Sequence, residues 1–258
     1  MEIEFITGHQ SDKLIVIFLG WGMEATSLAG VSKPAYDIAA VSDYRDIDPD
    51  YAWQPLADAA AGYGEVVVVA WSFGVRAAAC FLRGKGKNLP VTKRIAVNGT
   101  TAHIHDSKGI PTAIFNGTLA NLSEPNLRKF RRRMFSSAAE FGHFMESGCS
   151  RPFDTLKEEL ELFGRMAPDL EAGSLFDLAV IGEKDAIFPP AAQLEFWGNE
   201  KSELWEGMPH FPDFERILKR HIIDKELVAS RFAASASTYR DNAPVQARVA
   251  EQLWRYAG

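Results

Sequence analysis

The chain has 258 residues, of which 47% are hydrophobic and 24% charged, and this composition excludes a disordered or fibrous protein. Thirty-four acidic residues against 28 Lys and Arg give a net charge of −6, which argues against a generally basic nucleic-acid-binding protein. The N-terminus lacks a signal-peptide pattern, and no apolar run reaches the roughly 20 residues that span a bilayer. The two cysteines, Cys80 and Cys149, suggest neither a disulfide framework nor a metal site. We expect a cytoplasmic protein that binds neither nucleic acid nor membrane and carries no metal or cofactor.

Continuous apolar runs, which are typical of strands buried on both faces of a parallel sheet, recur along the chain. They predict strands at Leu14–Leu19, Ile38–Val41, Val66–Ala70, Arg94–Val97, Thr112–Phe115, Leu178–Ile181 and Glu203–Trp205. Helical patterns fall between many of these runs, at Leu56–Ala61, Val75–Leu82, Pro190–Trp197 and Asp213–Ile223. This alternation predicts an α/β fold with a mostly parallel sheet flanked by helices.

Only helical signals occur between about residues 119 and 172, which predicts a helical cap inserted between two strands of the sheet. Within this segment, Ser137 with Glu140 and Thr155 with Glu158 have the spacing of a capping box, in which each pair marks the start of a helix.

The pentapeptide AWSFG, residues 70–74, lies between the strongest predicted strand and the strongest predicted helix. This strand–turn–helix context is typical of a nucleophile elbow, whose turn lifts a serine hydroxyl clear of the sheet. Ala70 stands where the common pattern has glycine, a mild departure because alanine is nearly as small. The alternative is that Ser72 merely caps the following helix, but its position favours a nucleophile.

A serine hydroxyl needs a base to accept its proton. Of six histidines, His210 follows the last predicted strand, at the edge where α/β sheets place ligand chemistry. Asp185 follows the preceding strand and would orient His210, with Glu183 as its competitor. The chain order Ser72, Asp185, His210 is that of α/β-hydrolases. The alternatives are a structural loop histidine and an aspartate that only caps a turn.

An oxyanion hole requires two backbone amides aimed at the charge that develops during the reaction. Phe73, directly after Ser72, would supply one amide. Trp21 would supply the other, since Gly20 and Gly22 let the backbone after an early strand approach the substrate closely. The alternative is that Trp21 is only an aromatic core residue.

A basic cluster in the cap is a local exception in this acidic chain. On a helix, Arg128, Arg131 and Arg132 would share one side, while Phe130 and Met134 would lie on another. The cluster is either a solvated helix face or a binding surface for an acidic partner or a phosphate, and the spacing leaves both open.

The span from Met1 to about Ile223 resembles the BioG-type pimeloyl-[acyl-carrier protein] methyl ester esterases, compact α/β-hydrolases of biotin synthesis. Several of the segments that carry this resemblance lie outside the triad. They are FLGWGM (18–23), DYRD (43–46), AWSFG (70–74), VNGT (97–100), GIP (109–111), FNGT (115–118), FRRRM (130–134) and GMPH (207–210).

The resemblance implies a carboxylesterase that hydrolyses pimeloyl-[acyl-carrier protein] methyl ester to pimeloyl-[acyl-carrier protein] and methanol through a Ser-His-Asp acyl-enzyme mechanism. The cap would form an acyl channel with Phe130, Met134, Phe141 and Phe144, and the acidic carrier protein or its phosphopantetheine would dock on Arg128, Arg131, Arg132 and Arg133. The alternatives are a thioesterase, a general carboxylesterase, and a catalytically silent binding module.

The last residues differ from the rest, and we place a domain boundary near Leu227, with a hydrolase domain at 1–227 and a linker plus short helix at 228–258. The segments RFAASASTY (231–239), VQA (245–247) and AEQL (250–253) resemble the start of BioC-type malonyl-acyl-carrier-protein O-methyltransferases. This resemblance implies the esterase half of a fusion, with a fused or partner methyltransferase. The alternative is an extension that only looks similar.

Overall fold

The computed structural model describes residues 1–8, 11–47, 50–147, 149–223, 229–230 and 233. It divides into two compact units, Met1–Glu215 and Arg216–Gly258. The boundary expected near Leu227 and the short helix expected in the tail lie outside the described residues. No helix in the described ranges has the length and apolar character that crossing a membrane requires.

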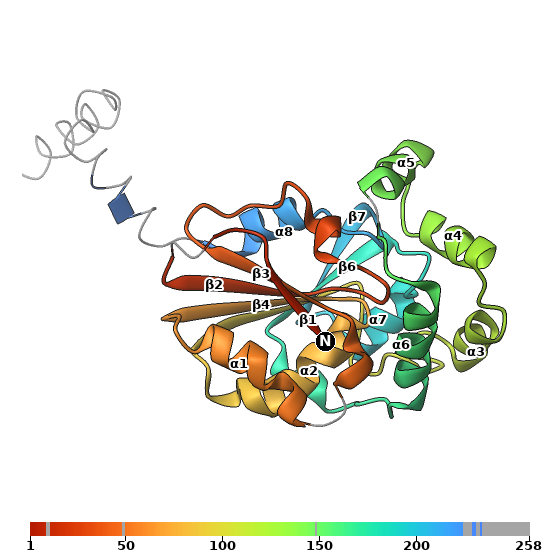
Figure 1. Cartoon of the computed structure of the whole chain (residues 1–258), viewed down its shortest axis with the longest axis horizontal. Helices are drawn as coiled ribbons and strands as arrows, with labels where there is room; N and C mark the ends of the chain where they lie inside the picture. Colours follow the sequence, from red (N-terminus) through yellow and green to blue (C-terminus); the bar gives the residue numbers. More distant parts are fainter. Residues whose placement is uncertain (9–10, 48–49, 148, 224–228, 231–232, 234–258) are drawn as a thin grey trace, which may run out of the picture. The chain divides into compact units, whose positions relative to one another are not determined.

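Within the described residues, seven strands form one sheet in the order β1-β3-β2-β4-β5-β6-β7 (Figure 1). The strands are β1 (Glu2–Phe5), β2 (Lys13–Phe18), β3 (Asp37–Ser42), β4 (Glu65–Trp71), β5 (Val91–Val97), β6 (Leu178–Lys184) and β7 (Ser202–Pro209). β1 runs antiparallel to β3, and the other neighbouring strands run parallel. The predicted mostly parallel sheet is therefore confirmed.

The register of the central strands brings the loops that follow them to one edge of the sheet. Phe18 pairs with Ala70 between β2 and β4, and Trp71 pairs with Val97 between β4 and β5. The apolar residues of β2 and β4 are almost fully buried, as expected for strands covered on both faces. The turn at Ser72 and the loops after β2 and β5 thus begin side by side.

The helices α1 (Gln54–Ala60) and α2 (Gly74–Arg83) lie on the same face of the sheet in Figure 1. Phe81 of α2 packs on Phe18 of β2 and on Trp53, with ring centroids 5.8 and 5.7 Å apart. The remaining elements are α7 (Pro190–Trp197), α8 (Phe214–His221) and the short 3₁₀ helices η1 (Ala25–Leu28), η2 (Tyr44–Asp46), η3 (Asp50–Trp53), η4 (Lys85–Asn88) and η5 (Ala172–Leu175). The four helices predicted outside the cap are confirmed by α1, α2, α7 and α8.

A helical insertion separates β5 from β6, and its helices gather at one end of the sheet in Figure 1. They are α3 (Thr112–Ala120), α4 (Glu124–Arg132), α5 (Ala138–Ser147) and α6 (Phe153–Arg165). The capping box predicted before α5 is confirmed: Glu140 N–H donates to Ser137 Oγ at 3.1 Å, and Ser137 N–H donates to Glu140 Oε2 at 3.0 Å. The capping box predicted at Thr155 and Glu158 is wrong, because α6 begins earlier, at Phe153.

The strand predicted at Thr112–Phe115 is also wrong, because these residues form the first turn of α3. Pro111 precedes the helix in an extended conformation, and Asp106 Oδ1 accepts the Thr112 N–H at 2.8 Å. Of the α3 residues only Phe115 is buried, whereas Ile114 is exposed. A run of four residues is too short to distinguish a strand from a helical turn. The helical run between β5 and β6 therefore begins at Thr112, before the expected position near residue 119.

Candidate active site

Ser72 lies in a sharp turn between β4 and α2. Its φ angle is +58°, a left-handed conformation that is strained for a residue with a side chain and that recurs at functional sites. Close backbone packing surrounds the turn: a Cβ on Gly74 would lie 2.4 Å from the Phe18 carbonyl oxygen, and a Cβ on Gly99 would lie 2.4 Å from the Ser72 carbonyl oxygen. Glycine is thus required at the start of α2 and in the adjacent loop after β5, and the turn has the strand–turn–helix geometry of a nucleophile elbow.

The structure brings Ser72, His210 and Asp185 together at the carboxyl edge of the sheet. His210 Nε2 lies 3.1 Å from Ser72 Oγ, and His210 Nδ1 lies 2.9 Å from both carboxylate oxygens of Asp185. All three side chains are buried. Because a carboxylate only accepts hydrogen bonds, a proton on Nδ1 suits this arrangement, and Nε2 then faces the Ser72 hydroxyl as an acceptor.

Local hydrogen bonds fix the orientation of the Asp185 carboxylate. Its Oδ1 accepts the N–H groups of Ile187 and Phe188 at 2.8 Å each, and its Oδ2 accepts Gln193 Nε2 at 3.2 Å. The competing acid Glu183 is exposed and accepts the Gly207 N–H at 2.9 Å. Asp185 therefore faces the imidazole, and Glu183 does not.

Asn98, at the end of β5, positions the histidine loop and was not among the predicted site residues. Its Nδ2 donates to the carbonyl oxygens of Pro209 and His210 at 2.8 and 2.9 Å, and its Oδ1 accepts the Gly182 N–H at 2.6 Å. Trp71 Nε1 also donates to the His210 carbonyl oxygen, at 2.9 Å. The available signal was a polar residue directly after a buried strand, at the same edge as Ser72.

Both residues predicted to donate to the oxyanion, Phe73 and Trp21, lie close to Ser72. Phe73 follows it directly, and the loop that contains Trp21 is adjacent, since a Cβ on Gly20 would lie 3.1 Å from Ser72 Cβ. Neither the Phe73 N–H nor the Trp21 N–H donates to an acceptor among the described residues. Both amides are therefore available to an oxyanion formed at Ser72.

A mainly apolar pocket lies over the Ser72–His210 pair. Of the residues predicted to form an acyl channel, Phe130 and Met134 line it. Phe141 and Phe144 do not; they pack in an aromatic cluster with Phe135, whose ring lies 4.8 Å from that of Phe211. Besides Phe130 and Met134, the pocket is lined by Gly20, Trp21, Trp71, Ser72, Phe73, Ile110, Ile114, Phe115, Thr118, Arg133, Leu160, Ile187 and His210.

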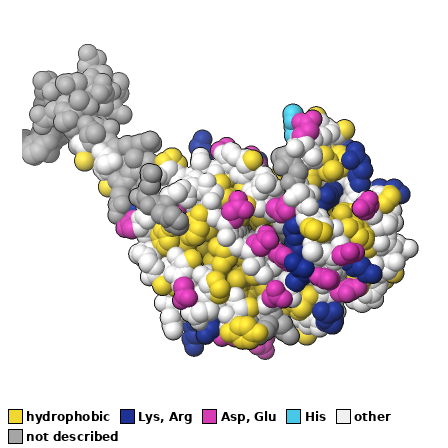
Figure 2. All heavy atoms as spheres, viewed as in Figure 1, with side chains coloured by type: hydrophobic (Ala, Val, Ile, Leu, Met, Phe, Trp, Pro, Cys, Tyr) yellow, Lys and Arg dark blue, Asp and Glu magenta, His cyan; other side chains and the backbone are white. Residues whose placement is uncertain are grey.

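The four cap arginines have different environments. Arg128 and Arg133 are exposed. The guanidinium carbon of Arg128 lies 5.3 Å from the Phe141 ring centroid, and that of Arg133 lies 5.7 Å from the Phe130 ring centroid. Arg132 is half-buried and donates to a backbone carbonyl oxygen at 2.9 Å. Arg131 is only 7% exposed, so it is not on the surface that a partner would contact. Figure 2 shows Lys and Arg side chains over α4, mixed with a few acidic ones.

His103 is a second buried histidine, close to Phe73. Its ring lies edge-on to the Phe73 ring at 5.7 Å, and its Nε2–H donates to the Phe163 carbonyl oxygen at 2.9 Å. Burial and the nearby charge of Arg76 lower the pKa of His103 to about 4, so this imidazole is neutral at neutral pH.

We expect His103→Gln to make stability less sensitive to acid. The pKa of His103 is about 4 when folded against 6.5 in a model peptide, so the unfolded chain binds the proton first as pH falls. The free energy of unfolding of the wild type should therefore drop by roughly 3 kcal/mol between pH 6.5 and 4 from this group alone. The glutamine amide of the variant would donate to the same carbonyl without titrating. In urea unfolding across this range, the free energy of unfolding of the wild type should exceed that of the variant by an amount that shrinks as the pH falls. A difference that stays constant with pH would contradict a buried neutral imidazole.

Comparisons with known proteins agree on fold and family. The sequence profile of the family described as pimeloyl-ACP methyl esterase BioG matches residues 1–215. The crystal structure of BioG from Haemophilus influenzae matches with a TM-score of 0.67 and 31% identity, over 84% of this chain and 96% of that chain. The crystal structure of a lipase-esterase related protein from Clostridium acetobutylicum matches with a TM-score of 0.57 and 13% identity, over 90% and 98% of the two chains, a likeness of fold alone. The predicted α/β-hydrolase fold is confirmed.

A third relative is longer than this chain. A malonyl-[acyl-carrier protein] O-methyltransferase of Bacteroides fragilis is 39% identical over 246 residues, which cover 93% of this chain and 48% of that protein. The chain thus spans about half the length of this relative. The family profile ends at residue 215, whereas the match to the longer protein covers 93% of this chain and so continues past that residue.

Proposed function

Because the chain belongs to the BioG family of pimeloyl-ACP methyl esterases, we propose that it hydrolyses pimeloyl-[acyl-carrier protein] methyl ester to pimeloyl-[acyl-carrier protein] and methanol in biotin synthesis. One observation carries the proposal beyond family membership. The buried hydrogen-bond chain from Ser72 Oγ through His210 to Asp185 ends beneath an apolar pocket. This geometry suits nucleophilic attack on an ester at the end of an aliphatic chain.

The reaction would proceed through an acyl-enzyme. Ser72 Oγ attacks the methyl ester carbonyl carbon while His210 Nε2 accepts the hydroxyl proton, and the Phe73 and Trp21 amides bind the oxyanion. As the carbon–oxygen bond to methoxide breaks, His210 returns the proton, and methanol leaves. His210 then takes a proton from water, which attacks the acyl-enzyme carbonyl and restores Ser72 with the free carboxylic acid as product.

The shape of the pocket supports a substrate with an apolar chain and a charged far end. Phe130, Met134 and Leu160 present apolar surface beside the serine, which suits the methylene chain of a pimeloyl group. Arg133 lines the same pocket and is exposed, so a phosphate group of a carrier-bound substrate would meet a cation there. We propose that the acidic carrier protein docks on the exposed Arg128 of α4 and on Arg133, which directly follows this helix.

The function is tested by assaying the purified protein on carrier-bound pimeloyl methyl ester, with acyl thioesters and short nitrophenyl esters beside it. We expect a clear preference for the carrier-bound methyl ester. Equal rates on all esters would identify a general carboxylesterase, and preferential cleavage of thioesters would identify a thioesterase. Complementation of biotin auxotrophy in a strain without its own esterase, with Ser72→Ala as the control, tests the same role in cells.

We expect Arg128→Glu to lower kcat/KM for the carrier-bound ester by roughly tenfold, because a reversed charge repels an acidic partner during encounter. The short nitrophenyl ester needs no docking, so its kcat/KM should change less than about twofold. Arg165→Glu is the matched control, since Arg165 is exposed and lines a different pocket beside Cys80 and Arg83. Equal losses on both substrates would contradict a docking role for Arg128.

The residues after the end of the family profile, here called the tail, support a proposed association with a methyltransferase. The match to the longer methyltransferase covers nearly the whole chain, including part of the tail. We propose that this chain corresponds to an esterase unit that is fused to, or works with, a methyltransferase that adds the ester it removes. Co-expression with and without a methyltransferase domain, followed by assay of the carrier-bound ester, tests this proposal.

A further inference from the structure

The loop that carries the proposed oxyanion donor Trp21 is anchored by the cap. Trp21 Nε1 donates to the Leu156 carbonyl oxygen at 2.8 Å, and Gly22 N–H donates to Glu159 Oε2 at 3.2 Å. Both acceptors belong to α6, more than 130 residues later in the chain. One anchor holds the Trp21 side chain and the other holds the Gly22 N–H, so the orientation of the Trp21 backbone depends on where α6 lies.

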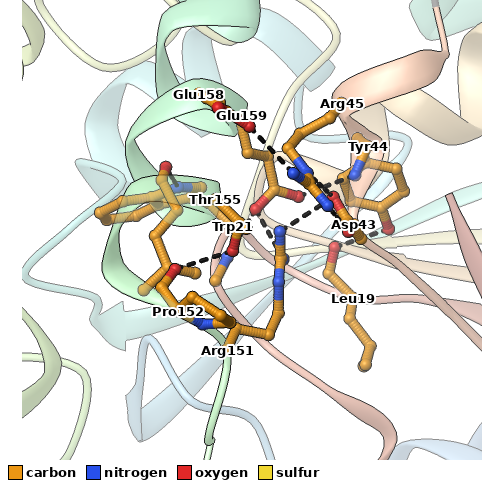
Figure 3. Close-up of polar contacts among 12 residues, drawn as sticks. Leu19, Trp21, Asp43, Tyr44, Arg45, Arg151, Pro152, Thr155, Glu158 and Glu159 are labelled. Carbon is orange, nitrogen blue, oxygen red and sulfur yellow. Dashed lines mark hydrogen bonds and ion pairs between the residues drawn. The ribbon is translucent and has the colours of Figure 1, made fainter.

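Glu159 is the centre of a buried ionic cluster, which Figure 3 shows together with Trp21. Its side chain is 0% exposed. Besides the Gly22 N–H, its carboxylate accepts the Tyr44 N–H at 2.9 Å and Arg151 Nη1 at 2.8 Å. Arg151 Nη2 lies 2.9 Å from Asp43 Oδ1 at the end of β3. One carboxylate therefore ties the loops after β2 and β3 to the cap.

The chemistry of the cluster requires an acceptor with two oxygens. Two backbone N–H groups and a guanidinium donate to Glu159, and none of them can accept in return. Burial raises the pKa of Glu159, while the Arg151 charge and the donated hydrogen bonds act in the opposite direction. A buried charge is costly unless it is paired and hydrogen-bonded, and each of these conditions is met here.

We propose that Glu159 is a positioning residue, which fixes the loop after β2 so that the Trp21 amide faces the oxyanion at Ser72. This inference rests on the proposed esterase mechanism. Stability alone would not need an ion pair at this place, because replacing both members of a buried ion pair with well-packed apolar groups of similar size is often neutral or stabilising. A small displacement of a reacting or stabilising group can cost about 10²-fold in rate, which gives the anchor a catalytic consequence.

The primary test is Glu159→Gln, which keeps the shape but replaces one acceptor oxygen with a donor NH₂. Because the Gly22 N–H and Arg151 Nη1 both donate to Oε2, the amide oxygen takes that place and the NH₂ meets the Tyr44 N–H. The tie between the Tyr44 backbone and α6 is then lost, and the Arg151 guanidinium loses the charge it pairs with. On a short nitrophenyl ester we expect kcat to fall roughly 10- to 100-fold, less than the ~10²–10³-fold loss of a whole oxyanion donor, with KM changed less than about threefold. Glu158→Gln is the matched control: this neighbour on α6 is 61% exposed and pairs with Arg45, and its kcat should stay within about twofold of wild type.

A second variant, Glu159→Asp, keeps the negative charge beside Arg151 but shortens the side chain, so it tests reach when Glu159→Gln does not fold. It should also lower kcat selectively, and both variants should lose affinity for a trifluoromethyl ketone that forms an oxyanion at Ser72, in parallel with kcat. Wild-type kcat in either folded variant, a loss confined to KM, or failure of both variants to fold would overturn the positioning role. Wild-type protein that is inactive on the nitrophenyl ester, or activity retained in Ser72→Ala, would instead overturn the proposed mechanism.

Discussion

Ser72→Ala should lower kcat by about 10⁶-fold, because it removes the atom that attacks the ester and leaves only the binding pocket and the oxyanion donors. The substitution is isosteric apart from the hydroxyl, and Ser72 already occupies a left-handed turn that alanine can adopt at a similar cost. Single-turnover kinetics on the carrier-bound methyl ester, with the folded state checked by thermal unfolding, measure the loss. A fluorophosphonate probe should label the wild type and leave Ser72→Ala unlabelled.

The effects of substituting Ser72 and His210 on kcat should not add. His210 has no function in the proposed mechanism without the serine whose proton it accepts 3.1 Å away. The double variant Ser72→Ala, His210→Ala should therefore be about as slow as Ser72→Ala alone, since residues that act as a unit do not contribute independently. A further large loss in the double variant, or probe labelling that persists without Ser72, would mean that another nucleophile carries the reaction.

The strands β2, β3 and β4 could be predicted from the sequence because their apolar runs are buried on both faces of the sheet. β1 and α3 show where this rule ends. β1 is four residues long, lies at the edge of the sheet and is half-exposed, so it has no continuous apolar run. The residues Thr112–Phe115 do look like a strand, but their conformation is set by the preceding Pro111 and by Asp106, which accepts a helix N-terminal N–H. A hydrophobic pattern in the sequence carries no information about local contacts of this kind.

For the candidate site, chain order and strand ends predicted which side chains could meet, and the structure places Ser72, His210 and Asp185 within hydrogen-bonding distance. Their catalytic roles stay predictions. What spacing could not predict was tertiary environment. Arg131 shares α4 with the exposed Arg128, yet it is buried because the helix turns this residue toward the Gly22 carbonyl oxygen. The two backbone N–H groups that donate to Glu159 likewise come from loops far away in the sequence, so no local pattern predicts them.

Asp185→Asn should lower kcat by roughly 10⁴-fold without changing the fold, because it inverts the histidine tautomer. The hydrogen bonds around Asp185 decide which way the new amide turns. Ile187 and Phe188 both donate N–H groups to Oδ1, so the amide oxygen must occupy that position. The NH₂ group then takes the place of Oδ2, 2.9 Å from His210 Nδ1, and donates to it. The imidazole proton moves to Nε2, which can no longer accept a proton from Ser72.

Glu183→Gln is the matched control for this prediction, because Glu183 is a carboxylate two residues earlier on the same strand end and contacts the Gly207 N–H instead of the imidazole. Its kcat should stay near that of the wild type. In Asp185→Asn, a ¹⁵N spectrum of the His210 ring should show the proton on Nε2, and thermal unfolding should show a folded protein. Comparing the two variants thus distinguishes a carboxylate that orients His210 from one that only lies near it. A large loss in Glu183→Gln with a small one in Asp185→Asn would reassign the acid, since an orienting carboxylate acts only through contact with Nδ1.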